Sequence, residues 1–390
     1  MNPSEMSFYQ PDHDAFRVSV REFVQREISP FYLEWEEQHL VDRTAFAAAG
    51  AAGVLGTRVE EAYGGGGTDD YRFRFIVAEE LASAGAASYS AGLAVQEDIV
   101  IPYVMELGSE EQKRRWLPGL TSGNQLGAIA MTEPGAGSDL QGTRTTAVRD
   151  GDEWLISGQK TFITNGIQSD TIVVLARTNP DAGSRGFSLF VVEAGDSGFS
   201  RGRKLDKIGL VAQDTAELFF EKVRVGRDRL LGEEGNGLRY LMERLPLERL
   251  SIAVAALCSA EAAYGWARDY VFERQAFSQD VGDFQTVRFT LAEIETELEV
   301  TRAYVEAATL KLNRGSLTAV DAAKAKWWAS ELQQRVINRS LQLFGGYGYM
   351  LEYPIARAYR DARIQTIYGG TTEIMKEIIG RDIAARAKRR

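Results

Sequence analysis

The sequence has few of the residues that carry catalysis without a cofactor. Among 390 residues there is one cysteine, Cys258, and the only histidines are His13 and His39. A single cysteine excludes an intrachain disulfide, and this set cannot form a zinc site of the usual kind. The same scarcity disfavours a Ser-His-Asp or Cys-His mechanism. We therefore expect carboxylates to serve as acid–base groups and a cofactor to supply any harder chemistry.

Positive charge and long apolar runs are also scarce. Lys plus Arg number 45 against 55 Asp plus Glu, a net charge of −10, which disfavours general nucleic-acid binding. No run of about 18 apolar residues is present, so we expect no membrane span. The stretch MNPSEMSFYQPDHDAF has no basic segment followed by an apolar core, so we expect no secretory signal and take the cytoplasm as the default location.

What is present divides the chain into three zones. Residues 1–122 have apolar residues at helical spacing, and residues 123–235 contain short β-type segments such as TIVVLART and FSLFVVEA. Residues 236–390 return to long helical patterns, with Pro246 expected to mark a kink or a start. The order predicts an α+β multidomain protein: an N-terminal helical domain, a middle antiparallel β domain and a C-terminal four-helix bundle.

The segment AMTEPGAGSDLQGTRT, residues 130–145, offers hydroxyls and glycine amides at close spacing. Thr132, Ser138 and these amides can hydrogen-bond to a polar ring system. The segment is not a dinucleotide fingerprint, because Leu140 stands where the last glycine belongs and no βαβ unit surrounds it. Taken alone, a loop between strands is the simpler interpretation.

A second segment, QKTFITNG at residues 159–166, strengthens the case for a ligand. Phe162 precedes Thr164 by two residues, so a flat apolar side chain and a hydroxyl donor stand close together. A bound flavin needs an apolar wall beside its ring and a donor near its N5 edge. The pair could provide both.

These two segments, MTEPGAGSD and QKTFITNG, resemble the flavin-binding motifs of the acyl-CoA dehydrogenases. The resemblance continues through DTAELFFEKVRV, LQLFGGYGYMLEYPIARAYRDARI and QTIYGGTTEI and covers nearly the whole chain. The C-terminal third is most similar to the long-chain branch. The resemblance implies an acyl-CoA substrate, FAD as cofactor, an electron-transfer flavoprotein as electron acceptor, a homotetramer and a role in fatty acid β-oxidation.

The resemblance also implies roles for individual residues. Thr132 and Ser138 would hydrogen-bond to the flavin ring and its surroundings, and Ser138 would also lie near the CoA arm. Phe162 would form an apolar wall beside the ring, and Thr164 would donate toward N5. Further residues would contact the FAD of a neighbouring subunit or lie near the adenosine side of the cofactor: Arg274, Phe277, Gln342, Gly345, Gly346, Thr371 and Glu373. The family usually has glycine where this chain has Ser278, which leaves the local backbone geometry open.

The loop YGGTT lacks the base that many family members carry. Where their loop reads Tyr-Glu-Gly-Thr, the glutamate is replaced here by Gly369. In the long-chain and isovaleryl branches the base lies on the first long helix of the C-terminal domain, and the matching residue is Glu248. In helical spacing Glu248 shares a largely small or apolar face with Ser251, Ile252 and Ala255, as a desolvated base requires.

Helical pattern alone would make Glu248 a surface glutamate, with Glu243 as its rival for the role of base. The resemblance favours Glu248 and implies that Tyr368, Gly369, Arg249 and Ser138 contact the substrate. The Gly369 amide would bind the thioester carbonyl, and the missing side chain would leave a volume that another helix can fill.

The implied reaction is α,β-dehydrogenation of an acyl-CoA thioester to a trans-2-enoyl-CoA. Two alternatives stay open at this point. One is a flavin-dependent oxygenase or oxidase on the same fold. The other is a non-catalytic flavoprotein interaction module, for which the missing loop glutamate is the main support. The sequence does not give the length or branching of the acyl chain.

Overall fold

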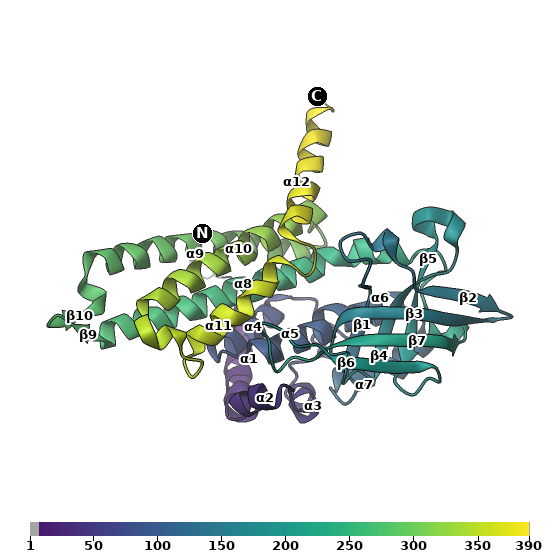
Figure 1. Ribbon diagram of the computed structural model, residues 1–390, viewed down its shortest axis with the longest axis horizontal. Helices are drawn as coiled ribbons and strands as arrows, with labels where there is room; N and C mark the ends of the chain where they lie inside the picture. The colour runs from purple at the N-terminus through teal and green to yellow at the C-terminus, as the bar shows by residue number, and fades with distance from the viewer. Residues whose placement is uncertain (1–7, 390) are drawn as a thin grey trace.

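A computed structural model describes residues 8–389 and shows helices, then a sheet, then helices along the chain (Figure 1). The predicted order of helical, β and helical domains is confirmed. The N-terminal helices are α1 (Pro11–Phe23), α2 (Tyr32–Gln38), α3 (Arg43–Ala51), α4 (Arg72–Ser83), α5 (Ala87–Ala94), α6 (Ile101–Leu107) and α7 (Glu110–Thr121). Short π-helical turns, Val24–Ile28 and Val95–Val100, follow α1 and α5 and continue their paths.

The β domain is one sheet of eight strands: β1 (Gly127–Ala130), β2 (Thr146–Asp150), β3 (Glu153–Thr164), β4 (Thr171–Arg177), β5 (Phe187–Glu193), β6 (Phe199–Lys204), β7 (Thr215–Val225) and β8 (Leu230–Leu231). The path is β6-β7-β3-β2-β4-β5-β8, and β1 pairs with β4. Most pairs are antiparallel, as predicted, whereas β1 and β2 run parallel to β4.

The continuous apolar run of β4 follows from burial on both faces of the sheet. Val173 and Leu175 pack with the core formed by α6, α7 and the start of α8, and Ile172 and Val174 pack in the core on the opposite face. Successive side chains of a strand point to opposite faces, so a strand covered on both sides is apolar at every position. The sheet is thereby held between packed layers, with its loops positioned by β3 and β4.

The C-terminal elements are α8 (Gly237–Glu273), the short strands β9 (Gln275–Ala276) and β10 (Gln279–Asp280), α9 (Gln285–Asn313), α10 (Ala319–Leu343), α11 (Pro354–Ala362) and α12 (Thr372–Ala387). The helix α8 runs through Pro246 without a break, so the proline does not start the helix. The core of this domain joins α8, α9 and α10, and α4 of the N-terminal domain packs into it.

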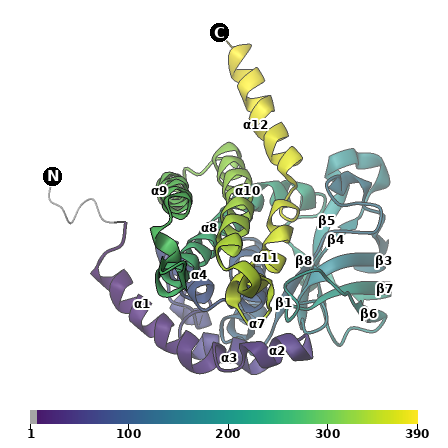
Figure 2. The ribbon, with the colours of Figure 1, turned by 60° about the vertical axis from the view of Figure 1, so that its left-hand side comes forward.

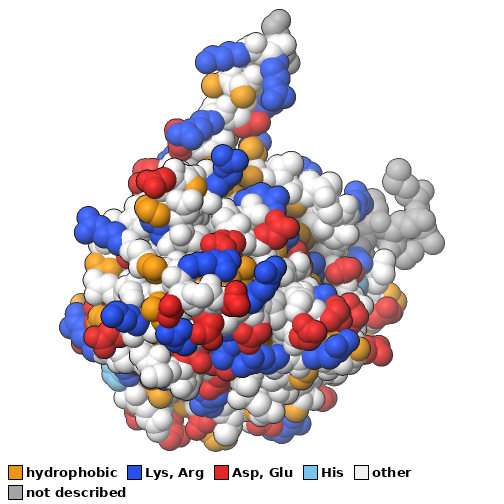
Figure 3. Space-filling view, turned by 90° about the vertical axis from the view of Figure 1, so that its right-hand side faces the viewer, with side chains coloured by type: hydrophobic (Ala, Val, Ile, Leu, Met, Phe, Trp, Pro, Cys, Tyr) orange, Lys and Arg blue, Asp and Glu red, His pale blue; other side chains and the backbone are white. Residues whose placement is uncertain are grey.

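Figure 2 shows α8, α9 and α10 side by side, with α11 against them and α12 extending away from the body. The space-filling view of the β-domain end shows the same projection above a surface on which acidic and basic side chains are intermixed (Figure 3). By length and composition alone, α8 could cross a membrane, but 56% of its most apolar window is buried within this fold. A core helix passes the same test, and α8 lies at the centre of the C-terminal core.

Candidate active site

A buried ion pair joins the two segments that were predicted to hold a flavin. The Lys160 ammonium on β3 donates to Glu133 Oε1 at 2.9 Å and to the Met131 carbonyl at 3.0 Å. Glu133 also accepts the backbone amides of Arg144 and Thr145 at 2.7 and 2.9 Å. Burial lowers the pKa of Lys160 to about 8, while the charge of Glu133 opposes this change. The pair therefore fixes the loop after β1 against the end of β3.

The predicted flavin contacts lie on this joined surface. The Thr161 amide donates to the Thr132 carbonyl at 2.9 Å, which brings the two segments side by side. Phe162 is 67% exposed and has a φ of 59°, an uncommon backbone conformation for a bulky residue. Thr132 and Thr164 are half-buried, and Ser138 is exposed.

These residues fit a flat, polar-edged ring. Phe162 offers an uncovered apolar face, while Thr164 stands beside it at the end of β3. A side chain at Gly135 or Gly137 would meet no atom within 4 Å, so the loop backbone is open to a ligand. This surface therefore has the features that a bound flavin ring requires, and the individual contacts stay predictions.

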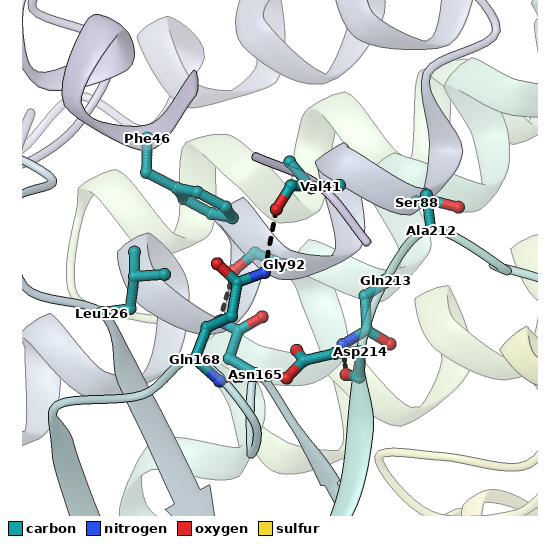
Figure 4. Close-up of a pocket in the computed structure, with 10 residues that line it drawn as sticks. All are labelled: Val41, Phe46, Ser88, Gly92, Leu126, Asn165, Gln168, Ala212, Gln213 and Asp214. Carbon is teal, nitrogen blue, oxygen red and sulfur yellow. Dashed lines mark hydrogen bonds between the residues drawn. The ribbon is translucent and has the colours of Figure 1, made fainter. Parts of the chain in front are cut away.

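A small cavity behind this surface is a joint between domains. Figure 4 shows residues of the N-terminal helices facing residues of the β domain across it. Asn165 donates to the Gly92 carbonyl at 3.1 Å, and Gln168 donates to the Val41 carbonyl at 2.9 Å. The cavity of about 10 Å³ has room for one water molecule, not for a substrate. Its hydrogen bonds anchor the segment that follows the end of β3, where Phe162 lies.

Glu248 is not a surface glutamate. It lies on α8 with 5% of its surface exposed, and the Tyr103 hydroxyl on α6 donates to its Oε1 at 3.1 Å. Burial raises the pKa of Glu248 to about 7, against the opposing effects of the Tyr103 hydrogen bond and the Arg249 charge. A carboxyl group with a pKa near neutrality is suited to accept a proton. The rival Glu243 is exposed and lies 3.8 Å from Arg239.

The Gly369 loop packs directly on the face of α8 that carries Glu248. Arg249 Nε donates to the Gly369 carbonyl at 3.2 Å. A Cβ placed on Gly369 would lie 2.3 Å from Ile252 Cδ1, and the φ of 64° at Gly369 favours glycine. The volume left by the missing loop side chain is therefore filled by Ile252, one turn after Glu248. Tyr368 is half-buried, and its hydroxyl donates to Gln365 at 2.9 Å.

The face around Glu248 is more polar than the sequence pattern indicated. Ser251 Oγ donates to Asp98 at 2.6 Å, and Asp98 also accepts from Arg74 Nε at 3.1 Å and from the Tyr71 hydroxyl at 3.2 Å. All these residues are buried. A hydrogen-bonded polar cluster thus lies one turn from the candidate base.

The second set of predicted cofactor residues lies elsewhere. Arg274 follows α8, and its guanidinium carbon lies 6.0 Å from the Tyr347 ring, beside the turn that holds Gly345 and Gly346 after Gln342 on α10. Figure 1 places β9 and β10, next to Arg274, at the opposite end of the molecule from β3. Within one chain the structure does not bring these residues to Phe162.

The turn after Arg274 shows the backbone geometry at Ser278, where the family usually has glycine. Phe277 and Ser278 have φ values of 54° and 66°, so Ser278 occupies the left-handed region in which the family's glycine is favoured. Phe277 is 91% exposed. Thr371 caps α12 by accepting the Ile374 amide at 3.4 Å, and Glu373 is exposed in the first turn of that helix.

Sequence reasoning missed several residues of this region. Tyr103 lies 145 positions from Glu248, and no local pattern links the two residues. Lys326 did leave a signal: it stands in the helical stripe of Ala322, Ala325 and Ala329, where an apolar residue is expected. Its side chain is fully buried beneath the Gly369 loop, and Nζ donates to the Gly370 carbonyl at 2.7 Å.

Comparisons with known proteins match nearly the whole chain to one family. Family models described as the N-terminal, middle and C-terminal domains of acyl-CoA dehydrogenase match residues 10–124, 128–223 and 235–384. The long-chain specific acyl-CoA dehydrogenase, mitochondrial, of Sus scrofa is 51% identical, over 96% of this chain and 87% of that protein. A short-chain specific acyl-CoA dehydrogenase of Clostridium acetobutylicum is 36% identical, over 94% of this chain and 97% of its own length.

Solved structures show the same relationship. An acyl-CoA dehydrogenase from Geobacillus kaustophilus superimposes with a TM-score of 0.93 at 47% identity, covering 96% of this chain and 98% of that one. A chain in a structure of the electron transferring flavoprotein of Acidaminococcus fermentans reaches 0.93 at 36% identity, with 97% and 99% covered. A glutaryl-CoA dehydrogenase from Mycobacterium smegmatis in complex with FADH2 reaches 0.91 at 27% identity, with 97% and 96% covered. The chain belongs to the acyl-CoA dehydrogenase family and is an enzyme of that family.

Proposed function

We propose that this enzyme uses FAD to convert a saturated acyl-CoA into the trans-2-enoyl-CoA, with Glu248 as the base. The observation that carries the proposal is the pairing of a buried carboxyl group, whose pKa is raised to about 7, with the glycine loop packed against it. Gly369 replaces the loop glutamate, and α8 supplies the carboxylate instead. Dehydrogenation of an acyl-CoA is also the activity for which the matching relatives are named.

Gly369, Glu248 and Tyr103 would each have a distinct role in the reaction. The Gly369 amide would donate to the thioester carbonyl and so acidify the α-proton. Glu248 would accept that proton, and Tyr103, which stabilises the carboxylate, would keep the base ionised near neutral pH. FAD, when bound beside Phe162, supplies the acceptor for the β-hydrogen and the electron pair.

The chain length of the substrate, the electron acceptor, the oligomeric state, the pathway and the location are each supported by a different observation. A long-chain substrate is supported by the 51% identity with the long-chain specific enzyme, and an electron-transfer flavoprotein as acceptor by the neighbour in such a structure. The short strand β9, next to Arg274, lies at the opposite end of the chain from β3, which carries Phe162 (Figure 1). This separation supports an oligomer, which we take as a homotetramer, because a second copy could bring Arg274 to the cofactor. A role in β-oxidation follows from the substrate class, and a cytoplasmic location rests on N-terminal composition alone.

The oxygenase or oxidase alternative shares the fold and the flavin but needs no base at the substrate α-carbon. The buried Glu248 favours the dehydrogenase over both this alternative and a non-catalytic flavoprotein, because a buried carboxyl group without a function would cost stability.

The proposed function predicts that saturated acyl-CoAs bleach the visible flavin absorbance of the purified protein without oxygen. An anaerobic titration with straight-chain and branched acyl-CoAs of increasing length measures this, and long chains are expected to bleach most completely. The enoyl-CoA formed is identified by mass spectrometry. A flavin that no acyl-CoA bleaches would contradict the proposal, and rapid reoxidation of the bleached flavin by oxygen would favour the oxidase.

Replacing Tyr103 by phenylalanine is expected to shift the rising limb of the pH profile of kcat/KM to higher pH. Activity requires ionised Glu248, so it rises with pH through a pKa of about 7. The Tyr103 hydrogen bond lowers that pKa, and its loss raises it. A hydrogen bond to a charged group contributes roughly 1.5–3 kcal/mol, equivalent to about 1–2 pH units.

The matched control is Tyr63→Phe, which removes a tyrosine–glutamate hydrogen bond of 2.6 Å between Tyr63 and Glu110 at the surface. This variant is expected to keep the wild-type profile. An unchanged profile in Tyr103→Phe would show that Glu248 does not govern the rising limb.

A further inference from the structure

Two buried cations hold consecutive carbonyls of the Gly369 loop. Arg249 on α8 donates to the carbonyl of Gly369 at 3.2 Å, and Lys326 on α10 donates to the carbonyl of Gly370 at 2.7 Å. Both side chains are buried, with 6% and 0% of each residue exposed. The cations come from different helices, so together they tie the loop to both.

The loop needs such restraint because its backbone is unusually free. Gly369 and Gly370 have φ values of 64° and 100°, a region that glycine enters readily and leaves readily. The Gly369 amide shares its residue with the carbonyl that Arg249 holds, and the next peptide is the one that Lys326 holds. The Gly369 N–H itself lies in the preceding peptide, between Tyr368 and Gly369. The Tyr368 amide donates to the Ile364 carbonyl at 3.2 Å, so this peptide is restrained by that bond on one side and by the two held carbonyls on the other.

The Lys326 ammonium makes one hydrogen bond in the described part of the chain. Among residues 8–389, the Gly370 carbonyl is the acceptor that its ammonium reaches. Burial lowers the pKa of Lys326 to about 8, with Arg249 adding to the effect. Burial of a lysine costs free energy, and Lys324, two positions earlier on α10, is only half-buried.

We propose that Lys326, acting with Arg249, is a positioning residue for the thioester carbonyl: it holds the Gly370 carbonyl so that the Gly369 amide points at the substrate. The inference rests on the proposed function, because it concerns the donor that polarises the thioester. It assigns Lys326 no contact with substrate or cofactor. A donor aimed in advance at the developing charge gives a large rate effect, and misalignment forfeits part of it.

The first measurement is steady-state kinetics on Lys326→Met, which keeps the length of the side chain and removes the donor. We expect kcat to fall on the order of 10–100-fold, with KM changed less than about threefold, because alignment matters most in the transition state. Lys326→Arg, which retains a cationic donor, is expected to recover part of the loss. Lys324→Met is the matched control on the same helix and is expected to behave as wild type.

The second measurement records the polarisation of the thioester carbonyl. In a Glu248→Gln background, which blocks turnover, an acyl-CoA labelled at its carbonyl carbon is bound and its carbonyl stretch is recorded by infrared difference spectroscopy. The chain length is the one that bleaches the wild-type flavin best. Binding is expected to lower the stretching frequency, and adding Lys326→Met is expected to remove at least half of that shift while FAD content stays the same.

The outcomes separate the two proposals. Wild-type bleaching tests the proposed function, and only the variants test Lys326. A wild-type carbonyl shift together with a kcat within twofold of wild type in Lys326→Met would overturn the inference. If Lys326→Met fails to hold FAD, Lys326→Gln replaces it for the same readouts. Failure of both to hold FAD, with Lys324→Met holding it, would make Lys326 a residue of the fold and also overturn the inference.

Discussion

Replacing Glu248 by glutamine is expected to lower kcat by roughly 10³-fold or more while FAD remains bound. A positioned general base contributes on the order of 10²–10⁴-fold, and no second carboxylate is available at Gly369. Glutamine preserves shape and the Tyr103 contact but cannot accept the proton. Anaerobic stopped-flow absorbance, following flavin bleaching by a saturated acyl-CoA, measures the chemical step directly.

Glu243→Gln is the control, because Glu243 lies on the same helix, is exposed and pairs only loosely with Arg239. It is expected to retain wild-type bleaching.

The thermal stability of Glu248→Gln at alkaline pH provides an independent test. The folded-state pKa of Glu248 is raised from 4.5 to about 7, so ionisation of this group destabilises the fold as pH rises through that window. At pH 8 the glutamine variant should melt no lower than wild type. Near-normal bleaching in Glu248→Gln would exclude Glu248 as the base.

Replacing Lys160 by methionine is expected to destabilise the protein by about 3–5 kcal/mol, the usual cost of removing one partner from a buried ion pair. The change would leave the Glu133 carboxylate buried without its cation and the Met131 carbonyl without its donor. Because this pair joins both flavin segments, FAD retention should fall together with stability. Urea unfolding and the flavin content after gel filtration measure the two effects.

Lys113→Met provides the comparison for this variant. Lys113 forms a surface pair with Glu110 at 3.2 Å, and exposed pairs contribute only about 0–1 kcal/mol. We expect its unfolding midpoint and flavin content to match wild type. Equal midpoints and equal flavin content in the two lysine variants would show that the Lys160–Glu133 pair does not hold the flavin segments together.

Much of the architecture could be predicted from the sequence, because the patterns that indicate helices and strands are local. The apolar run of β4 indicated a strand. In the sequence, Ser109 is followed three residues later by Gln112, which is the pattern of a capping box, and α7 begins there with both hydrogen bonds present at 3.3 and 2.8 Å. Pro246 misled in part, because a proline usually interrupts a helix, yet α8 continues through it. Packing of α8 in the C-terminal core, through residues such as Leu247 and Leu250, outweighs one missing backbone hydrogen bond.

The sequence by itself determined the order of domains, the family and the candidate base, since Gly369 and Glu248 are read directly from two motifs. Only the tertiary structure decided how that base is tuned. The raised pKa of Glu248 depends on burial and on Tyr103, the filled space at Gly369 depends on Ile252, and the hold on the loop depends on Lys326. Solvation, packing and hydrogen bonding between distant segments arise from three-dimensional proximity, which helical and strand periodicity do not encode.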